Sequence, residues 1–208
     1  MWPLKWGTAL ADFDNDGDLD LVVANGHIYP QIDGHPEAIG TYRQRNLLLE
    51  NRLRRDDLPP GAKAETLFRD ATAEAGPGFG LERSHRGLAV GDFDNDGRLD
   101  ILITALDSPP ELLHNEGATG SWLTVVCEVP GGTAVPIGTR VTVTTGGRTM
   151  TQDIAAGDSY LSTHDPRPHF GLGNAETVDE IVVRWPDGTR SVRRGVRARQ
   201  FLVVKKGS

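Results

Sequence analysis

Residues 91–100 read Gly-Asp-Phe-Asp-Asn-Asp-Gly-Arg-Leu-Asp, and residues 11–20 read Ala-Asp-Phe-Asp-Asn-Asp-Gly-Asp-Leu-Asp. The two strings start eighty positions apart and differ only at their first and eighth residues. Four carboxylates within nine residues repel one another unless a positive charge lies between them. The pattern favours Ca²⁺, which takes about six to eight oxygen ligands and tolerates irregular geometry.

The loops are numbered from Asp12 and Asp92, the second residue of each string. The spacing then assigns a role to each loop position. Side chains at positions one, three and five can turn toward one centre, and the glycine at position six permits the positive φ that closes the loop. Position seven supplies a backbone carbonyl, and position nine supplies the last carboxylate. We therefore predict two Ca²⁺ sites, at residues 12–20 and 92–100. The predicted ligands are Asp12, Asp14, Asp16 and Asp20, then Asp92, Asp94, Asp96 and Asp100, with Asp18 and Arg98 contributing backbone oxygens.

These loops are not EF-hands. An EF-hand needs a Glu at position twelve and flanking helices, whereas position twelve is Val23 in one copy and Ile103 in the other. Apolar, β-branched residues follow each loop, which predicts that it joins strand to strand. The alternative is that Asp-Gly-rich segments are only good turns, and the near-identical second copy argues against it.

Composition agrees with a turn-rich β protein. The chain has 208 residues, of which 38% are hydrophobic, with Gly 25 and Pro 13. Residues 1–120 hold 11 Lys and Arg against 21 Asp and Glu, whereas residues 121–208 hold 11 against 8. Nine of the acidic residues lie in the two loops, and two bound Ca²⁺ ions would change the net charge from −7 to −3. Part of the acidity is thus explained by metal sites.

The order strand, loop, strand, turn, strand occurs twice in the first 119 residues. Leu-Leu-Glu-Asn at 48–51 is echoed by Leu-Leu-His-Asn at 112–115. Such a repeat indicates propeller blades, which need neighbours to bury their faces. We predict an all-β fold with about two blades at residues 1–119, an incomplete propeller. The predicted strands are 8–13, 19–24, 46–51, 66–70, 88–93, 99–105 and 111–114, and residues 25–40 are a predicted surface loop.

The pattern changes at residue 120, where we place a domain boundary. Short apolar or alternating segments separated by Gly and Asp turns predict a small β-sandwich or barrel at residues 120–208. The predicted strands are 122–129, 139–145, 149–155, 159–162, 169–172, 179–185, 190–192 and 200–205. No segment has a helical pattern.

The sequence contains few features that indicate a cellular compartment. Cys127 is the only cysteine, so no intrachain disulfide can form, and its valine neighbours suggest an inert thiol. No run reaches the length of a membrane span. The N-terminus lacks the apolar region of a signal peptide, so the protein is either cytoplasmic or exported by a signal outside this sequence.

The sequence resembles known families over nearly its whole length. The two acidic strings are similar to FG-GAP/VCBS repeats, the calcium-loop blades of integrin-like propellers. Residues 137–141, 157–162, 169–173 and 183–188 resemble the ASPIC/UnbV domain of the cartilage acidic protein family and its bacterial relatives, whereas Thr133 to Pro136 depart from that family's pattern. Members carry more repeats upstream, so the resemblance implies a C-terminal fragment or a truncated gene, secreted or placed on the cell surface or in the periplasm, with further blades expected.

Three functions remain open. The first is a non-enzymatic, calcium-binding adhesion or recognition module that binds a protein or glycan and carries about two structural ions. The second is a polysaccharide hydrolase or lyase whose active site lies in missing upstream blades, and the third is an accessory protein of a secreted assembly. A catalytic metal needs an open position and a nearby acid or base, whereas these loops use their carboxylates on one ion.

Other polar groups have plainer interpretations. His27, Asp33 and His35 suit a polar loop better than a transition-metal or glycan site. His164, Asp165 and His169 lack a nucleophile with an identifiable base. The arginines of residues 190–199 suit a solvated strand face better than a nucleic-acid site, because Phe201 is their only aromatic neighbour, although a sulfated polysaccharide stays open.

Overall fold

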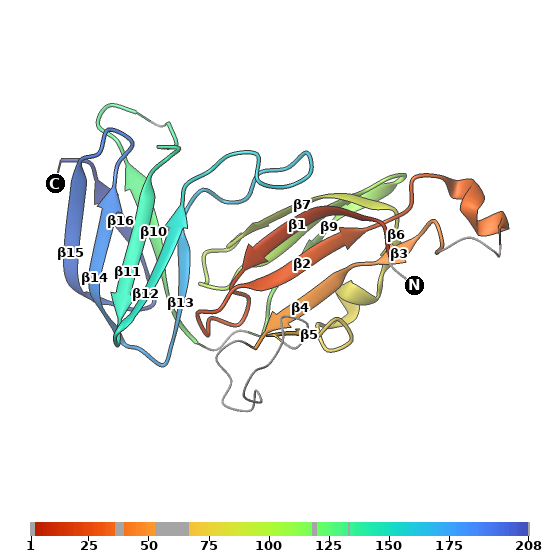
Figure 1. The fold of residues 1–208 in the computed structure, drawn as a ribbon, viewed down its shortest axis with the longest axis horizontal. Coiled ribbons are helices and arrows are strands. Elements are labelled where there is room, and N and C mark those ends of the chain that lie inside the picture. The colour runs from red at the N-terminus through yellow and green to blue at the C-terminus, as the bar shows by residue number, and fades with distance from the viewer. Residues whose placement is uncertain (1–2, 36–39, 53–66, 118–119, 133, 208) are drawn as a thin grey trace.

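A computed structural model describes residues 3–35, 40–52, 67–117, 120–132 and 134–207 (Figure 1). Strands dominate this part of the chain, which confirms the all-β prediction. No helix within these residues has the length and apolar composition that a membrane crossing requires.

Two open antiparallel sheets form the part of the chain that precedes residue 118. The first has the order β1-β2-β4-β5 and the second β7-β8-β9, and a two-stranded ribbon pairs β3 with β6. Pro30–Gly34 and Pro77–Gly80 form the short 3₁₀ helices η1 and η2. The strands are β1 Lys5–Ala11, β2 Asp20–Asn25, β3 Gln44–Arg45, β4 Leu47–Asn51, β5 Phe68–Asp70, β6 Glu82–Arg83, β7 His85–Gly91, β8 Asp100–Ala105 and β9 Ser108–Leu113.

The two larger sheets pack face to face, with β7 against β1 and β2. Alternate residues of the strands point into the shared core, where Val22, Leu88 and Ile103 are fully buried. Phe13, at the second position of the first loop, packs against this core, whereas its counterpart Phe93 is 68% exposed. The repeated sequence thus gives stacked units, consistent with blades.

The later strands form a second pair of open sheets, ordered β13-β10-β16 and β12-β11-β14-β15. Their inward faces share one core, in which Trp185, Phe170 and Leu123 are buried. This arrangement is a sandwich, so the barrel alternative is wrong. The strands are β10 Ser121–Glu128, β11 Arg140–Thr145, β12 Arg148–Asp153, β13 His169–Gly173, β14 Thr177–Arg184, β15 Arg190–Arg197 and β16 Gln200–Lys205.

Local chemistry explains where these strands end. Gly146 and Gly147 connect β11 to β12 with φ values of 54° and 79°, which is the pair of positive values that a tight type I′ hairpin requires. Arg148 begins the next strand directly after this turn.

Burial against the sandwich core raises the pKa of the Cys127 thiol to about 11, so it is protonated at neutral pH and unreactive.

One predicted strand is wrong. Residues 159–162 form a turn with a single bridge between Ser159 and Ser162. The turn belongs to a long connection, residues 154–168, that extends from the sandwich toward the first strands (Figure 1). There the Asp165 N–H donates to the Val90 carbonyl at 2.8 Å, and the Thr8 N–H donates to Ser159 Oγ at 3.2 Å. Hydrogen bonds to two other sheets hold this segment in place, and within it only the single bridge between Ser159 and Ser162 forms.

Candidate metal centre

Each acidic string forms the connection inside a hairpin, one between β1 and β2 and the other between β7 and β8. The two connections have the same backbone, with φ near 60° at Asn15 and Asn95 and near 90° at Gly17 and Gly97. Asparagine is a residue that tolerates the left-handed region. The predicted role of glycine fits this geometry, and the asparagine immediately before the third aspartate shares it.

Three carboxylates of the first loop converge. One oxygen from each of Asp12, Asp14 and Asp16 lies within 4.8 Å of the others. Asp12 is only 2% exposed, and neither of its oxygens accepts a well-formed hydrogen bond from any residue that the structure describes. Burial first, and then repulsion from Asp14, Asp16 and Asp20, raise its pKa to about 8, despite a favourable contribution from the Gly17 N–H. A buried carboxylate that accepts no well-formed hydrogen bond is costly, and a bound cation would reduce that cost.

The ninth-position aspartates close the loops. Asp20 accepts the N–H of Asn51 at 2.8 Å and that of Phe13 at 3.3 Å. Asp100 does the same with Asn115 at 2.8 Å and Phe93 at 3.0 Å. The Leu-Leu-x-Asn echo therefore has a structural meaning, because each echoed asparagine donates its backbone N–H to the end of its own loop. Burial and the nearby Asp14 and Asp16 raise the pKa of Asp20 to about 7, although its two backbone donors oppose the rise.

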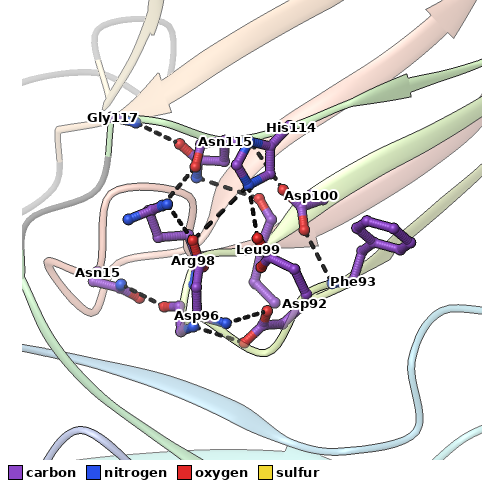
Figure 2. A network of polar contacts seen from close by, with 12 residues as sticks. Asn15, Asp92, Phe93, Asp96, Arg98, Leu99, Asp100, His114, Asn115 and Gly117 are labelled. Carbon is purple, nitrogen blue, oxygen red and sulfur yellow. Dashed lines mark hydrogen bonds and ion pairs between the residues drawn. The ribbon is translucent and has the colours of Figure 1, made fainter.

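The second loop gathers carboxylates from a different set of positions and adds a histidine (Figure 2). Oxygens of Asp92, Asp94 and Asp100 lie within 4.8 Å of one another, and those of Asp94 and Asp96 also lie within this distance of a His114 nitrogen. Asp92 accepts the N–H groups of Asp96 at 3.0 Å and Gly97 at 2.8 Å. Burial raises the pKa of Asp92, and these donors counteract the rise. His114 was not among the residues predicted from the sequence, although the echo aligns it with Glu50 beside the first loop.

Both loops face the sandwich, which holds them through two arginines. Arg148 donates to the Asp16 carbonyl at 2.9 Å and to the Gly17 carbonyl, and it pairs with the Asp18 carboxylate at 3.2 Å. Arg167 donates to the side chain of Asn95 at 2.7 Å and to the Asp92 carbonyl at 3.0 Å. These contacts span more than seventy residues of sequence, and no spacing rule predicts them.

A buried series of hydrogen bonds crosses the interface between the two loops and the sandwich, which we call the joint. The Asn15 amide donates to the Gly97 carbonyl at 2.9 Å, and its oxygen lies 2.8 Å from Nε2 of His169. The other ring nitrogen of His169 lies 2.8 Å from the hydroxyl of Thr124. Burial lowers the pKa of His169 to about 4. His169 therefore has a structural role at the joint.

This burial predicts acid sensitivity. The folded state binds a proton on His169 less readily than the unfolded state does. The contribution of the neutral imidazole to the free energy of unfolding is therefore complete above about pH 6.5 and decreases as the pH falls toward 4. The unfolding free energies of the parent and His169→Gln, measured by urea denaturation at one calcium concentration, should differ by about 2 kcal/mol less at about pH 5 than at about pH 7.5. Carboxylate titrations common to both proteins cancel in this difference. A difference that does not change with pH would contradict the assignment of a buried neutral imidazole.

The donor set fits calcium. The predicted ligand side chains are hard carboxylate oxygens, the ligand type that Ca²⁺ prefers. The first loop also contains the buried carboxylate of Asp12, which accepts no well-formed hydrogen bond from the described residues. The side chain of Asp18 pairs with Arg148, and that of Arg98 pairs with Asp96, so their backbone carbonyls are the groups left for the predicted role at position seven.

The remaining polar candidates have structural partners. His164 Nδ1 accepts the Val90 N–H at 3.2 Å, and Asp165 pairs with Arg167. In the long loop, Asp33 accepts the Tyr42 N–H at 2.7 Å, and His27 Nδ1 accepts the Tyr29 N–H at 3.1 Å. These contacts give each of the four side chains a partner within the fold.

Two family models match separate parts of the chain. Residues 131–208 match the family described as ASPIC and UnbV, and residues 86–121, which contain the second loop, match the FG-GAP repeat. The chain is homologous to cartilage acidic protein 1. It is 29% identical to the Mus musculus protein over 95% of this chain and 36% of that protein, and 29% identical to the Homo sapiens protein over 95% and 35%. The chain thus spans about a third of the length of the curated relatives that it matches.

Proposed function

We propose that this protein is a calcium-stabilised, non-enzymatic recognition module in which two propeller blades, residues 1–119, precede an ASPIC/UnbV domain, residues 120–208. About two structural Ca²⁺ ions would occupy the loops at 12–20 and 92–100. The observation that carries the proposal is the buried carboxylate of Asp12, which lies beside Asp14 and Asp16 and accepts no well-formed hydrogen bond from the described residues.

The proposed ligands are those expected from the spacing. Asp12, Asp14, Asp16 and Asp20 with the Asp18 carbonyl would hold one ion, and Asp92, Asp94, Asp96 and Asp100 with the Arg98 carbonyl the other. The ion supplies positive charge among the carboxylates and fixes the turn between two strands. Asp12 is 2% exposed and its carboxylate lies against Gly171 of the sandwich, which favours a structural role over a catalytic one.

The proposed binding of calcium also favours a cellular location for the protein. Extracellular calcium modules work with dissociation constants of about 10⁻⁴ to 10⁻³ M, which suits calcium-rich fluids outside the cell. The curated relatives carry the name cartilage acidic protein. We therefore place the whole protein outside the cell, on its surface or in a periplasm, with a protein or glycan as its partner.

Further blades are part of this proposal. Leu10, Leu21 and Leu49 lie in one cross-strand row of the first sheet, and Leu10 is 60% exposed. Leu102 and Leu112 form a similar row on the second sheet and are 44% and 45% exposed. Propeller blades stack on both faces, so these rows are the surfaces on which additional blades would pack.

Thermal unfolding tests the metal assignment. At a hundredfold excess over the dissociation constant, each occupied site should stabilise the folded state by about 2.7 kcal/mol. Calcium should raise the unfolding midpoint of the parent relative to chelator, magnesium should do so less, and the Asp16→Asn/Asp96→Asn variant should respond weakly.

The matched control is Asp153→Asn/Asp179→Asn, which removes two carboxylates outside the loops and should respond to calcium as the parent does. An equal calcium response in the parent and the loop variant would contradict the proposed sites.

A further inference from the structure

Three arginines stand in one cross-strand row on the outward face of the sheet β12-β11-β14-β15. Arg140 of β11 lies opposite Arg184 of β14, and Arg184 lies opposite Arg190 of β15. All three arginines are exposed, whereas the adjacent Val141 and Val183 are fully buried in the sandwich core. Residues directly opposite each other share one face of a sheet, and neighbouring strands lie about 4.8 Å apart. The row therefore brings three positive charges together on one face, and we call it the arginine row.

Folding alone does not explain the arginine row, because like charges directly opposite each other destabilise a sheet. The carboxylate of Asp153 on β12 ends the row, where it lies opposite Arg140 and pairs with it at 2.7 Å. Arg184 and Arg190 form no ion pair with any residue that the structure describes. The row thus keeps positive charge that the fold does not neutralise.

The acidic residues near the row are paired with other cations. Glu180, also on β14, pairs with Arg194 of β15 at 2.5 Å. Asp187, in the turn between β14 and β15, pairs with Lys206 at 2.6 Å and accepts the Thr189 N–H at 3.1 Å. These carboxylates are therefore not the counter-ions of Arg184 or Arg190.

The rest of this face suits a carbohydrate better than a nucleic acid. The cross-strand row beside the arginines consists of Thr151, Thr142, Val182 and Val192, so hydroxyl groups accompany the positive charge. None of the four strands of this sheet contains an aromatic residue, whereas single-stranded nucleic acids bind largely by stacking bases on aromatic side chains.

We infer that the arginine row binds a glycan that carries sulfate esters. Sulfate esters are oxyanions, and a guanidinium group donates paired N–H groups to such oxyanions. β15 is the edge strand of its sheet and lies at the end of the molecule away from the blades and their acidic loops (Figure 1). The inference rests on the recognition role in the proposed function, because it names the class of glycan, but it does not use the calcium sites.

Binding of a fluorescein-labelled heparin oligosaccharide, measured by fluorescence anisotropy at about 0.15 M salt, tests this inference. At this ionic strength the Debye length is about 8 Å, so the distant acidic loops contribute little. Arg184→Thr/Arg190→Thr should weaken binding about tenfold, because it removes two charge-assisted contacts. Arg184→Lys/Arg190→Lys should weaken binding less, since the charges remain while the paired donors are lost.

Arg45→Thr/Arg83→Thr is the matched control. It removes the same charge from the ribbon of β3 and β6, where Arg45 pairs with Glu82 and Arg83 lies 3.7 Å from Glu111. It should change the dissociation constant for the oligosaccharide less than about twofold.

A urea denaturation checks that the loss of binding is not a loss of fold. The Arg184→Thr/Arg190→Thr protein should keep the midpoint of the parent, because both side chains are exposed and threonine is favourable in strands. A clearly lower midpoint would assign the arginine row to the fold and overturn the inference.

Equal binding by the parent and Arg184→Thr/Arg190→Thr would overturn the inference. Equal affinity of the parent for a desulfated oligosaccharide, or for a double-stranded DNA oligonucleotide, would overturn the assignment to sulfated glycans. A protein that binds no heparin but is still stabilised by calcium would refute this inference alone. Heparin binding through the row without any response to calcium would instead refute the proposed calcium sites, so the two failures are distinguishable.

Discussion

Replacing Gly97 with alanine should lower the free energy of unfolding by about 3 kcal/mol. The residue has φ of +88°, and a Cβ there would overlap the indole of Trp122. The left-handed backbone costs an L residue about 1–2 kcal/mol, and forcing a buried ring to move costs about 1–3 kcal/mol more. Urea denaturation at a fixed calcium concentration measures the loss.

Gly188→Ala separates the two contributions. Gly188 has φ of +84°, and no atom lies within 4 Å of a Cβ built there, so its substitution should incur only the backbone cost of about 1–2 kcal/mol. Equal losses of unfolding free energy in the two variants would mean that Trp122 does not pack on the second loop, which would contradict the packing described at the joint.

Trp185→Ala should lower the free energy of unfolding by about 3–5 kcal/mol. The side chain is fully buried, and its Nε1 donates to Ser191 Oγ at 3.1 Å. Removing it creates a cavity and leaves the serine hydroxyl without this partner. Because whole domains are stable by only about 5–15 kcal/mol, the midpoint of the denaturant transition should shift markedly.

Leu10→Ala is the control for this change, because Leu10 is 60% exposed and its truncation should cost about 0.5 kcal/mol or less. A loss below about 1 kcal/mol for Trp185→Ala would contradict its place in the sandwich core.

The loops were predictable because their determinants are local. Carboxylates at alternate positions, a glycine that closes the turn and an apolar strand after it all lie within about twelve residues. The echo of Leu-Leu-x-Asn also contained the closing N–H of Asn51 and Asn115, although its meaning became clear only from the hydrogen bonds to Asp20 and Asp100.

The joint was not predictable from the sequence. Arg148 and His169 reach the first loop from more than 130 positions away, and no local spacing marks either residue. The same limit explains the sandwich topology, because alternation indicates which residues face a core but not that β10 and β16 pair in parallel. It also explains the error at Ser159, whose Oγ accepts a hydrogen bond from Thr8 in another sheet.

The most direct test of the calcium assignment is the number of ions bound. Equilibrium dialysis of the metal-free protein against calcium, with the bound metal measured by atomic absorption, should give about two ions per chain for the parent. Asp12→Asn/Asp14→Asn should retain about one ion, and the same change combined with Asp92→Asn/Asp94→Asn should retain none. A parent that binds no calcium, or a four-residue variant that binds as much as the parent, would contradict the account.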